Sequence, residues 1–505
     1  MSNHLFDLIA ARIEDPAKTF IETLDGETIS YGQVLARSAR YANALRDLGV
    51  KTGDRVAVQV EKSPAMLMLY LACARAGAIF LPLNTAYTVA ELDYFVSDAE
   101  PKLVVCDPAR REAIAAIAAK HGAVVETLDA QGKGSLYDKA HAASDQFANI
   151  VRGPDDLAAI LYTSGTTGRS KGAMLSHDNL ASNSLALQQY WRFTRDDVLI
   201  HALPIYHTHG LFVATNVMLF AGGSMLFLPK LDPDAILKVM PRATSMMGVP
   251  TFYTRLLAHA GLNRDATKHM RLFISGSAPL LADTHREWRE RTGHAILERY
   301  GMTETNMNTS NPYDGDRVAG TVGFPLPGVE LRVADPETGK LLGVEEIGVI
   351  EVKGPNVFKG YWRNPQKTAE EFRADGFFIT GDLGKVDARG YVHIVGRGKD
   401  LVITGGFNVY PKEVESEIDA LPGVVESAVI GVPHKDFGEG VTAVVVREKG
   451  AGVTEAQVAQ ALEARLAKFK LPKKVIFVDD LPRNTMGKVQ KNVLRETYKG
   501  LYKGA

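Results

Sequence analysis

Over residues 161–172 the chain reads Leu161-Tyr-Thr-Ser-Gly-Thr-Thr-Gly-Arg-Ser-Lys-Gly172, an apolar strand end followed by a loop rich in glycine and hydroxyl groups. The segment before it, residues 157–161, is apolar and strand-like. Glycine lets the backbone turn sharply, and backbone N–H groups and hydroxyls in such a loop can surround phosphate oxygens. Arg169 and Lys171 add the positive charge that suits a polyphosphate. The glycine spacing is not that of a P-loop, and a mobile surface turn explains the motif equally well when it is taken alone.

Length and composition bound the class of the protein. The 505 residues exceed what one hydrophobic core usually serves, so two or more domains are expected. The net charge of −1 argues against a nucleic-acid partner, which would require a basic excess. Cys73 and Cys106 are the only cysteines, which excludes a disulfide framework and a Cys-rich metal site.

A cytoplasmic location without a membrane partner is expected. The uncharged residues 211–228 are long enough to raise the question of a membrane span. They contain Thr215, Asn216 and the pair Gly222-Gly223, which favour a buried helix, a tight turn and a strand. Charged residues among the first fifteen positions interrupt the apolar core that a signal peptide needs.

The pattern of strands and helices predicts an α/β fold with unequal domains. Over the first 310 residues, apolar β-branched runs alternate with helical patterns, which predicts layered α/β subdomains with parallel strands. From about residue 318 to 396, closely spaced strands and turns predict a β-rich subdomain. We therefore predict a large domain over residues 1–396, a hinge at 397–400 and a small mobile α+β domain over 401–505. Helices of the small domain are expected at residues 411–421, 455–469 and 488–498.

Further polar motifs follow the first loop along the chain. They are Ser275-Gly-Ser-Ala-Pro-Leu280, Glu298-Arg-Tyr-Gly-Met-Thr-Glu304, Thr380-Gly-Asp-Leu383, Gly396-Arg397 and Pro482-Arg-Asn-Thr-Met-Gly-Lys488. Each has an ordinary explanation alone, Asp382 as a turn residue and Lys488 as a solvated surface charge. Together and in this order, they resemble the adenylate-forming superfamily of acyl-CoA synthetases, luciferases and peptide-synthetase adenylation domains. The resemblance covers almost the whole chain.

The resemblance implies an ATP site in the large domain. Asp382 would accept hydrogen bonds from the ribose with Arg397 alongside, Thr303 would contact the α-phosphate, and Glu304 would hold Mg²⁺. The β- and γ-phosphates would lie in the loop formed by Thr163, Ser164, Gly165, Thr166, Thr167 and Gly168. The adenine pocket would be formed by Ser277, Ala278, Pro279, Glu298, Tyr300 and Gly301, with Tyr300 stacked on the base.

The resemblance also implies two chemical steps. In the first, ATP and a carboxylate form an acyl-adenylate and pyrophosphate, and Lys488 would supply positive charge between the two anions. In the second, the small domain would rotate about Lys399 so that coenzyme A can attack, with pantetheine lying along Gly405, Gly406 and Phe407. Acylation of the Lys488 amine would remove its charge and stop the first step.

The segment Leu203-Pro-Ile-Tyr-His-Thr-His-Gly210 limits which carboxylic acids are expected as substrates. It lacks the aspartate with which amino-acid-activating relatives pair the substrate amine, and no carrier domain is expected to follow. His207 would lie between the acyl pocket and the nucleotide, as a gate that also contacts the acid. The segment, the pair Glu298-Arg299 and the basic start of the helix after Pro279 most resemble malonyl-CoA synthetases.

A small dicarboxylate needs a cation for its distal carboxylate, because an unpaired buried charge is costly. Arg286 is the favoured candidate and Arg299 the second, although a structural ion pair explains either arginine equally well. The expected function is ATP-dependent ligation of malonate or methylmalonate to coenzyme A, releasing AMP and pyrophosphate. The alternatives are a CoA ligase for an aryl or medium-chain acid, a luciferase-like oxygenase and a binding-only adenylate sensor, which could dispense with Lys488.

Overall fold

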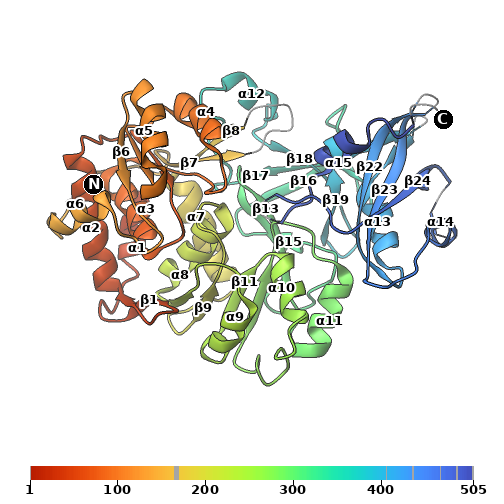
Figure 1. The fold of residues 1–505 in the computed structure, drawn as a ribbon, viewed down its shortest axis with the longest axis horizontal. Coiled ribbons are helices and arrows are strands. Elements are labelled where there is room, and N and C mark those ends of the chain that lie inside the picture. Colours follow the sequence, from red (N-terminus) through yellow and green to blue (C-terminus); the bar gives the residue numbers. More distant parts are fainter. Residues whose placement is uncertain are drawn as a thin grey trace.

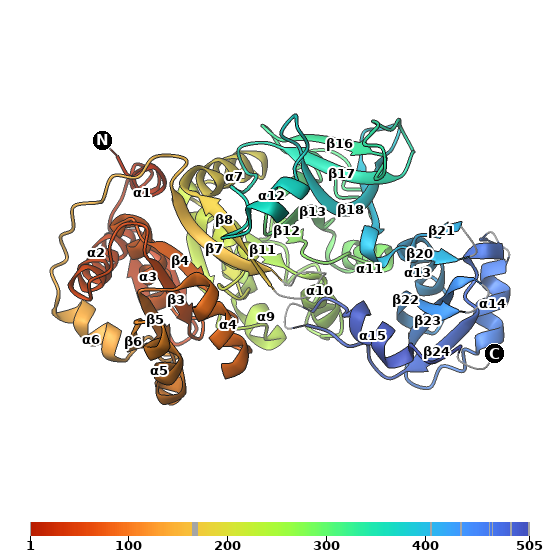
Figure 2. The same cartoon turned by 90° about the horizontal axis from the view of Figure 1, so that it is seen from above.

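The computed structural model describes residues 2–163, 170–404, 407–434, 437–463, 465–466, 468–484 and 487–502. A large N-terminal domain holds two mainly parallel sheets and a smaller antiparallel sheet, and a small C-terminal domain holds the fourth sheet (Figure 1). Seen from above, the first sheet and the C-terminal domain lie at opposite ends of the molecule (Figure 2). The predicted α/β class with a large and a small domain is thus confirmed.

The first sheet has six strands in the order β6-β5-β3-β4-β7-β8. Strands β6, β5, β3, β4 and β7 pair in parallel, whereas β8 pairs antiparallel with β7. Helix α3 is buried on nearly every side, as expected of a helix whose residues are apolar apart from Arg75. The strands are β3 (Arg55–Gln59), β4 (Ile79–Pro82), β5 (Leu103–Cys106), β6 (Val124–Thr127), β7 (Leu157–Thr163) and β8 (Lys171–Ser176). The helices are α2 (Tyr31–Asp47), α3 (Pro64–Ala76), α4 (Val89–Ala99), α5 (Arg111–Lys120) and α6 (Ser135–Ala142).

The second sheet has nine strands in the order β15-β14-β13-β12-β11-β9-β10-β1-β2. Strands β13, β12, β11, β9, β10 and β1 are mutually parallel, whereas β2, β14 and β15 pair antiparallel at the edges. The strands are β1 (Thr19–Thr23), β2 (Thr28–Ser30), β9 (Val198–His201), β10 (Ser224–Phe227), β11 (Ser245–Gly248), β12 (Leu272–Ser275), β13 (Leu297–Met302), β14 (Asn306–Ser310) and β15 (Phe324–Pro325). The helices are α1 (His4–Ala10), α7 (His177–Tyr190), α8 (Asn216–Ala221), α9 (Pro233–Val239), α10 (Pro250–Leu257) and α11 (Ala282–Thr292).

Two sequence expectations for the large domain need adjustment. The strands are not all parallel, because the connections of the β1–β2, β7–β8 and β13–β14 hairpins are too short for a crossover. Residues 211–228 form a buried helix, a turn and a strand as predicted, but the helix opens with a π-helical segment, η2 (His209–Thr215). Among the described residues, no helix combines the length and apolar character needed to cross a bilayer.

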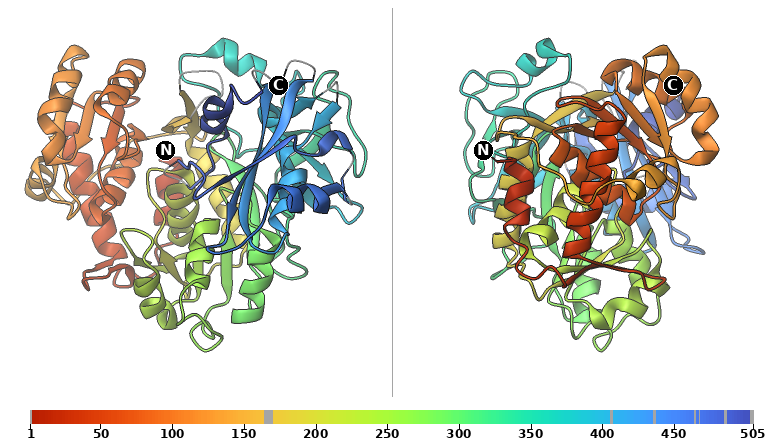
Figure 3. Two further views of the ribbon diagram at one scale, coloured as in Figure 1. Left: turned by 45° about the vertical axis from the view of Figure 1, so that its right-hand side comes forward. Right: turned by 90° about the vertical axis from the view of Figure 1, so that its left-hand side faces the viewer.

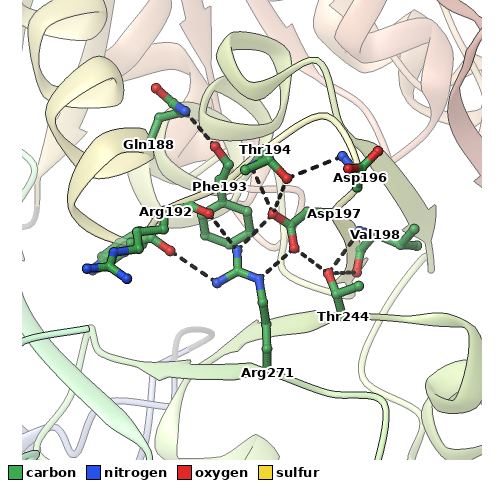
Figure 4. A network of polar contacts seen from close by, with 10 residues as sticks. Gln188, Arg192, Phe193, Thr194, Asp196, Asp197, Val198, Thr244 and Arg271 are labelled. Carbon is green, nitrogen blue, oxygen red and sulfur yellow. Dashed lines mark hydrogen bonds and ion pairs between the residues drawn. The ribbon is translucent and has the colours of Figure 1, made fainter. Parts of the chain in front are cut away.

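A polar network braces the end of the second sheet at which its parallel strands begin (Figure 4). The Arg271 guanidinium donates from Nε and Nη2 to the two Asp197 carboxylate oxygens, at 2.7 and 2.8 Å. Thr244 Oγ1 donates to the same carboxylate at 2.7 Å. These residues precede β12, β9 and β11, so the network holds three strands in register and leaves their opposite ends for the site.

The third sheet, β16-β17-β18-β19, is the predicted β-rich subdomain. It is followed by a single turn of 3₁₀-helix, η4 (Gly398–Asp400). The C-terminal domain begins beyond this turn and comes forward, in blue, in the left view of Figure 3. The strands of this sheet are β16 (Glu330–Ala334), β17 (Gly348–Lys353), β18 (Phe378–Val386) and β19 (Val392–Arg397), with α12 (Pro365–Glu370) between β17 and β18.

The C-terminal domain has a five-stranded sheet in the order β21-β20-β23-β22, with β24 beside β23. The predicted third helix, residues 488–498, begins later than expected, because Gly487 has φ +73 and Lys488 belongs to the turn before the helix. The predicted second helix is shorter than 455–469, since a 3₁₀ turn, η5 (Lys468–Lys470), stands shortly before Pro472. The elements are β20 (Val402–Thr404), β21 (Phe407–Val409), α13 (Pro411–Asp419), β22 (Val424–His434), β23 (Gly438–Arg447), α14 (Glu455–Glu463), β24 (Lys474–Val478) and α15 (Lys491–Tyr498).

Candidate active site

The candidate site lies where the parallel strands of the second sheet end. The carboxyl ends of β9, β11, β12 and β13 share one edge of the sheet, which is the usual place for ligands in open α/β folds. The chain after β12 carries Ser277, Ala278 and Pro279, and the turn after β13 carries Thr303 and Glu304. The fold thus brings together the polar motifs of residues 275–280 and 298–304.

Asp382 connects this edge to the third sheet. Its Oδ2 accepts a hydrogen bond of 2.6 Å from the Tyr300 hydroxyl, and its Oδ1 lies 3.1 Å from Arg397 Nε. Asp382 and Arg397 are directly opposite one another on β18 and β19. The negative charge of Asp382 raises the pKa of Arg397. Three residues from separate motifs therefore form one polar group.

The turn after β12 is held in a strained conformation. Ser277 has φ +70, which is uncommon for a residue with a side chain. Glu298 stabilises the end of this turn, since its Oε1 accepts a 3.1 Å hydrogen bond from the Leu280 N–H. Burial raises the pKa of Glu298 to about 8, and its Oε2 has no hydrogen-bond partner within the described part of the chain. Strain of this kind is typical of ligand-binding turns.

Glu304 is the carboxylate best placed for a metal ion. It is buried, its Oε1 lies 3.1 Å from the Tyr361 hydroxyl, and burial raises its pKa. The same hydroxyl donates to Glu371 Oε2 at 2.5 Å, and Lys171 lies 3.2 Å from Glu371 Oε1. The described residues contain no cluster of three metal-ligating side chains. Mg²⁺ typically binds one or two carboxylates plus substrate phosphates, so a single buried glutamate near Lys171 fits this ion.

Lys488 reaches this site from the C-terminal domain. Its turn is braced by Asn484, whose side chain accepts from the Lys488 N–H at 2.9 Å, and by Arg483, which donates to the Gly487 carbonyl at 2.7 Å. Desolvation and the positive charge of Arg397 lower the pKa of Lys488 to about 8, while Asp382 and Glu304 act in the opposite direction. The site thus combines groups from both domains.

Arg299 is a buried cation next to the same site. Only 2% of the residue is exposed, and its Nε and Nη2 lack hydrogen-bond partners within the described ranges. It lies against Gly276, where an added Cβ would be 2.4 Å from Arg299 Cζ, so glycine makes room for the guanidinium. Burial lowers the pKa of Arg299 to about 9. A guanidinium with unused donors is suited to hold an anionic ligand.

Two histidines line the same region. Burial, and secondarily the charge of Lys488, lowers the pKa of His207 to about 3, so the imidazole is neutral. His209, which the sequence analysis did not select, has its Nδ1 at 3.3 Å from Ser277 Oγ, and burial and Arg299 lower its pKa. Its place in the same short segment as His207 was the only sequence signal. Tyr361 and Glu371 were also missed, because neither residue belongs to one of the polar motifs that the sequence analysis used.

Arg286 does not fit the role that the sequence analysis preferred for it. Its side chain is 63% exposed on α11 and forms an ion pair with Asp283 one turn earlier. It lies on the rim of a groove of about 470 Å³ between α11 and α13, together with Lys412 and Glu413. A solvated and already paired guanidinium offers little advantage to a buried carboxylate. The structure therefore favours Arg299.

Several predicted residues can be placed only in part. Thr163 ends β7, Gly301 lies in β13, and Lys399 lies in η4. Phe407 is exposed and stacks on Phe469 with ring centroids 4.7 Å apart. Outside the described residues lie Ser164, Gly165, Thr166, Thr167, Gly168, Gly405 and Gly406.

Comparisons with known proteins agree with this arrangement. The AMP-binding enzyme family model matches residues 10–362, and its C-terminal domain model matches residues 413–488. The chain is 37% identical to a feruloyl-CoA synthase from an Amycolatopsis species, covering 94% of both chains. It is 33% identical to a malonate–CoA ligase from Arabidopsis thaliana, covering 98% of this chain and 91% of the relative.

Solved structures are more similar still. Crystal structures of MatB from Rhodopseudomonas palustris share 74% identity, and each pair covers 99% of this chain and 100% of the other. The TM-score is 0.98 for the ATP-bound structure and 0.87 for the apo structure. Both family models match in the predicted order, so the chain belongs to the AMP-binding enzyme family.

Proposed function

We propose that this protein is an AMP-forming acid–CoA ligase that joins malonate to coenzyme A through a malonyl-adenylate. The observation that carries the choice of acid is the buried Arg299, whose guanidinium has unused donors at the carboxyl edge of the second sheet. The catalytic assignment rests on Lys488, which lies close enough to Asp382, Arg397 and Glu304 for their charges to shift its pKa. Family membership and the malonate–CoA ligase relative support both parts.

In the first step a malonate carboxylate oxygen attacks the α-phosphorus of ATP, and the bond to pyrophosphate breaks. Lys488 carries positive charge between the carboxylate and the α-phosphate, which otherwise repel each other. Thr303 contacts the α-phosphate, Asp382 and Arg397 hold the ribose, and Tyr300 stacks on the base. Adenine lies against residues 277–279, Glu298 keeps that turn closed through Leu280, and His207 separates the acid from the nucleotide. The glycine-rich loop 163–168 takes the β- and γ-phosphates.

Glu304 is the residue that would hold Mg²⁺, with the remaining ligands supplied by phosphate oxygens and water. The ion, when bound, neutralises charge that develops on the leaving pyrophosphate. Tyr361 lies beside the Glu304 carboxylate, with its hydroxyl 3.1 Å from Oε1. Lys171 pairs at 3.2 Å with Glu371, which also contacts the Tyr361 hydroxyl.

In the second step the thiol of coenzyme A attacks the acyl carbon and AMP leaves. Lys488 occupies the site in the present arrangement, so the thiol needs the C-terminal domain to rotate. The short η4 segment is the proposed hinge, with Lys399 as its pivot and residues 405–407 as the wall of the pantetheine channel. Asp400 in this segment pairs with Arg495 on α15 at 2.5 Å, which ties the hinge to the domain that moves.

Lys399→Pro should separate the two steps. Proline fixes φ near −65° and restricts the residue before it, so CoA-dependent turnover should fall roughly tenfold or more, whereas adenylate formation should change little. Pyrophosphate release without CoA measures the first step, and thioester formation measures the second. An unchanged second step would show that the chain rotates about another residue.

The pH dependence of the first step should follow Lys488. Its amine is charged below its pKa of about 8 and neutral above it, so kcat/KM for adenylate formation should fall as pH rises through that value. ATP–pyrophosphate exchange measured across pH 6 to 10 tests this expectation, with the range set by about two units on either side. In Lys488→Arg, whose guanidinium stays charged, whatever activity remains should not fall near pH 8. A decline at the same pH in that variant would assign the titration to another group.

An aryl acid is the second candidate, because a feruloyl-CoA synthase is among the relatives. An aryl pocket is apolar and has no use for a buried guanidinium, so Arg299 favours the dicarboxylate. Methylmalonate adds only a methyl group and is expected to compete with malonate. Acetate and propionate lack the second carboxylate and should react poorly.

A panel of acids tests the proposal directly. The purified protein, ATP, Mg²⁺ and CoA are incubated with malonate, methylmalonate, acetate, propionate or ferulate, and AMP and the thioester are followed by chromatography and mass. Malonate should give the highest kcat/KM. A preference for ferulate would leave the ligase assignment in place and overturn malonate, and no AMP with any acid would overturn the ligase assignment for this panel.

Two further expectations belong to this proposal. Acylation of the Lys488 amine removes the charge on which the first step depends, so an acylated preparation should lose adenylate formation. A cytoplasmic location stays a prediction, in keeping with free Cys73 and Cys106, both buried.

A further inference from the structure

Lys62 is a lysine that no step above uses. It lies between β3 and α3, and its ammonium ends against the second sheet, at the carboxyl ends of β9 and β10. It donates to the carbonyl oxygens of His201 and Leu228, at 2.8 and 2.6 Å, and lies 2.9 Å from His201 Nδ1. The ring of Phe227 is 4.2 Å from its nitrogen. The three ammonium protons therefore have three acceptors.

All three acceptors are uncharged. Burial, with no compensating carboxylate among the described residues, lowers the pKa of Lys62 well below its usual value. An apolar side chain of similar length could fill this space without the desolvation cost of a cation. We therefore expect Lys62 to contribute through its hydrogen bonds, which hold the ends of two strands and one histidine ring in place.

His201 connects Lys62 to the active-site segment, because its two ring nitrogens contact Lys62 and Gly210. It is fully buried, and its Nε2 lies 2.9 Å from the Gly210 carbonyl oxygen. A carbonyl only accepts, so Nε2 carries the proton and Nδ1 is left to accept from Lys62. Thr215 Oγ1 also donates to the Gly210 carbonyl, at 2.9 Å. The Gly210 carbonyl is thus held by two donors, one of which is fixed by Lys62.

Gly210 belongs to the segment that carries both active-site histidines. An added Cβ at Gly210 would be 2.0 Å from the Pro204 carbonyl oxygen, so the chain folds tightly back on itself here. The Leu211 N–H donates to the His207 carbonyl at 2.9 Å, which links the π-helix η2 to the loop before it. π-Helical turns often occur at functional sites because they place side chains that a regular helix could not.

We propose that Lys62 is a positioning residue for the acid pocket, which acts through His201 and Gly210 to hold His207 and His209 in place. It does not touch the substrate, since its donors are all used within the protein. The inference builds on the proposed ligase function, but the contact chain itself involves no ligand. It also joins the first sheet to the second, so that a residue of one subdomain sets the pocket of the other.

Lys62→Met tests this role, because methionine keeps the length and removes the three donors. Hydrogen exchange of the Leu211 amide reports the segment directly and needs no substrate. Loss of a charge-assisted contact should raise its exchange rate roughly tenfold, and KM for malonate should rise by roughly ten- to thirtyfold with KM for ATP changed less than about twofold. The matched control is Lys120→Met on α5, whose side chain is 60% exposed and pairs with Asp93 at 3.1 Å; it should match the wild type in every measurement.

The outcomes separate positioning from simple stabilisation. If Lys62→Met lowers Tm while Leu211 exchange and the ratio of the two KM values stay at wild-type levels, Lys62 is only structural and the proposal is wrong. A soluble variant with unchanged Tm, exchange and kinetics also overturns it. Should Lys62→Met fail to fold, Thr215→Val removes the second donor to Gly210 and is expected to give the same pattern more weakly; wild-type behaviour there would count against the proposal. If the wild type does not use malonate, the proposed function fails, yet the exchange result still decides the role of Lys62.

Discussion

Replacing Lys488 with alanine should lower the rate of adenylate formation roughly 10²–10³-fold, the effect of removing one preorganised charge donor from an active site. The reason is that Lys488 brings a positive charge from the C-terminal domain to Asp382, Arg397 and Glu304. Once the acyl-adenylate has formed, the positive charge of Lys488 is no longer needed. Thioester formation from a supplied malonyl-adenylate should therefore lose much less.

ATP–pyrophosphate exchange measures the first half-reaction, and single-turnover thioester formation measures the second. Lys491→Ala is a useful control, because this lysine is three positions further along and pairs with Glu415 at 2.5 Å within the C-terminal domain. It should leave both half-reactions within about threefold of the wild type, as expected of a residue outside the site. An equal loss of both half-reactions in Lys488→Ala would mean that the residue does not act in adenylation alone.

Arg299→Met should lower kcat/KM for malonate roughly 10–100-fold or more, since a hydrogen bond to a charged group contributes about 1.5–3 kcal/mol and tenfold in rate corresponds to about 1.36 kcal/mol. Propionate has no distal carboxylate, so its kcat/KM should stay the same or rise. Arg299 has no ion-pair partner among the described residues, so its removal should not lower Tm, because its desolvation cost disappears with it. Steady-state kinetics with both acids, beside a thermal melt, provide the measurement.

Arg286→Ala is the matched control, since this arginine is exposed and already paired with Asp283. Its kcat/KM for malonate should remain within about twofold of the wild type, as is usual for a surface ion pair. The contrast between acids is decisive, because a misfolded variant loses all substrates together. If Arg299→Met lowers malonate and propionate in parallel, Arg299 is structural; if Arg286→Ala alone lowers malonate, the original sequence preference was right.

Short-range patterns in the sequence were sufficient for most of the architecture. Apolar β-branched runs over the first 310 residues predicted parallel strands, and β3 and β5 are such strands, because strands of a parallel sheet are buried on both faces. The switch to closely spaced strands near residue 318 predicted the third sheet. Three of the polar motifs lie in contact with one another in the structure. Tyr300, Asp382 and Arg397 come from three stretches and meet at 2.6 and 3.1 Å.

Features that depend on contacts between distant segments could not be predicted in this way. No local pattern indicates that Tyr361 contacts Glu304, or that Lys62 reaches across two sheets to His201. The π-helix η2 was missed for a related reason: it is stabilised by the closed loop at Gly210 and by packing around a buried histidine, not by helix propensity.

The sequence by itself determined the family and the order of its two parts, since both are encoded in short motifs that follow one another along the chain. Only the tertiary structure distinguishes Arg286 from Arg299, and this difference is why Arg299 is the arginine proposed for the distal carboxylate. Both residues are arginines near the same motifs, so the sequence offers no chemical difference between them. Burial distinguishes them, because β13 directs one guanidinium into the protein against Gly276 whereas α11 presents the other to water, and burial is a property of the assembled fold.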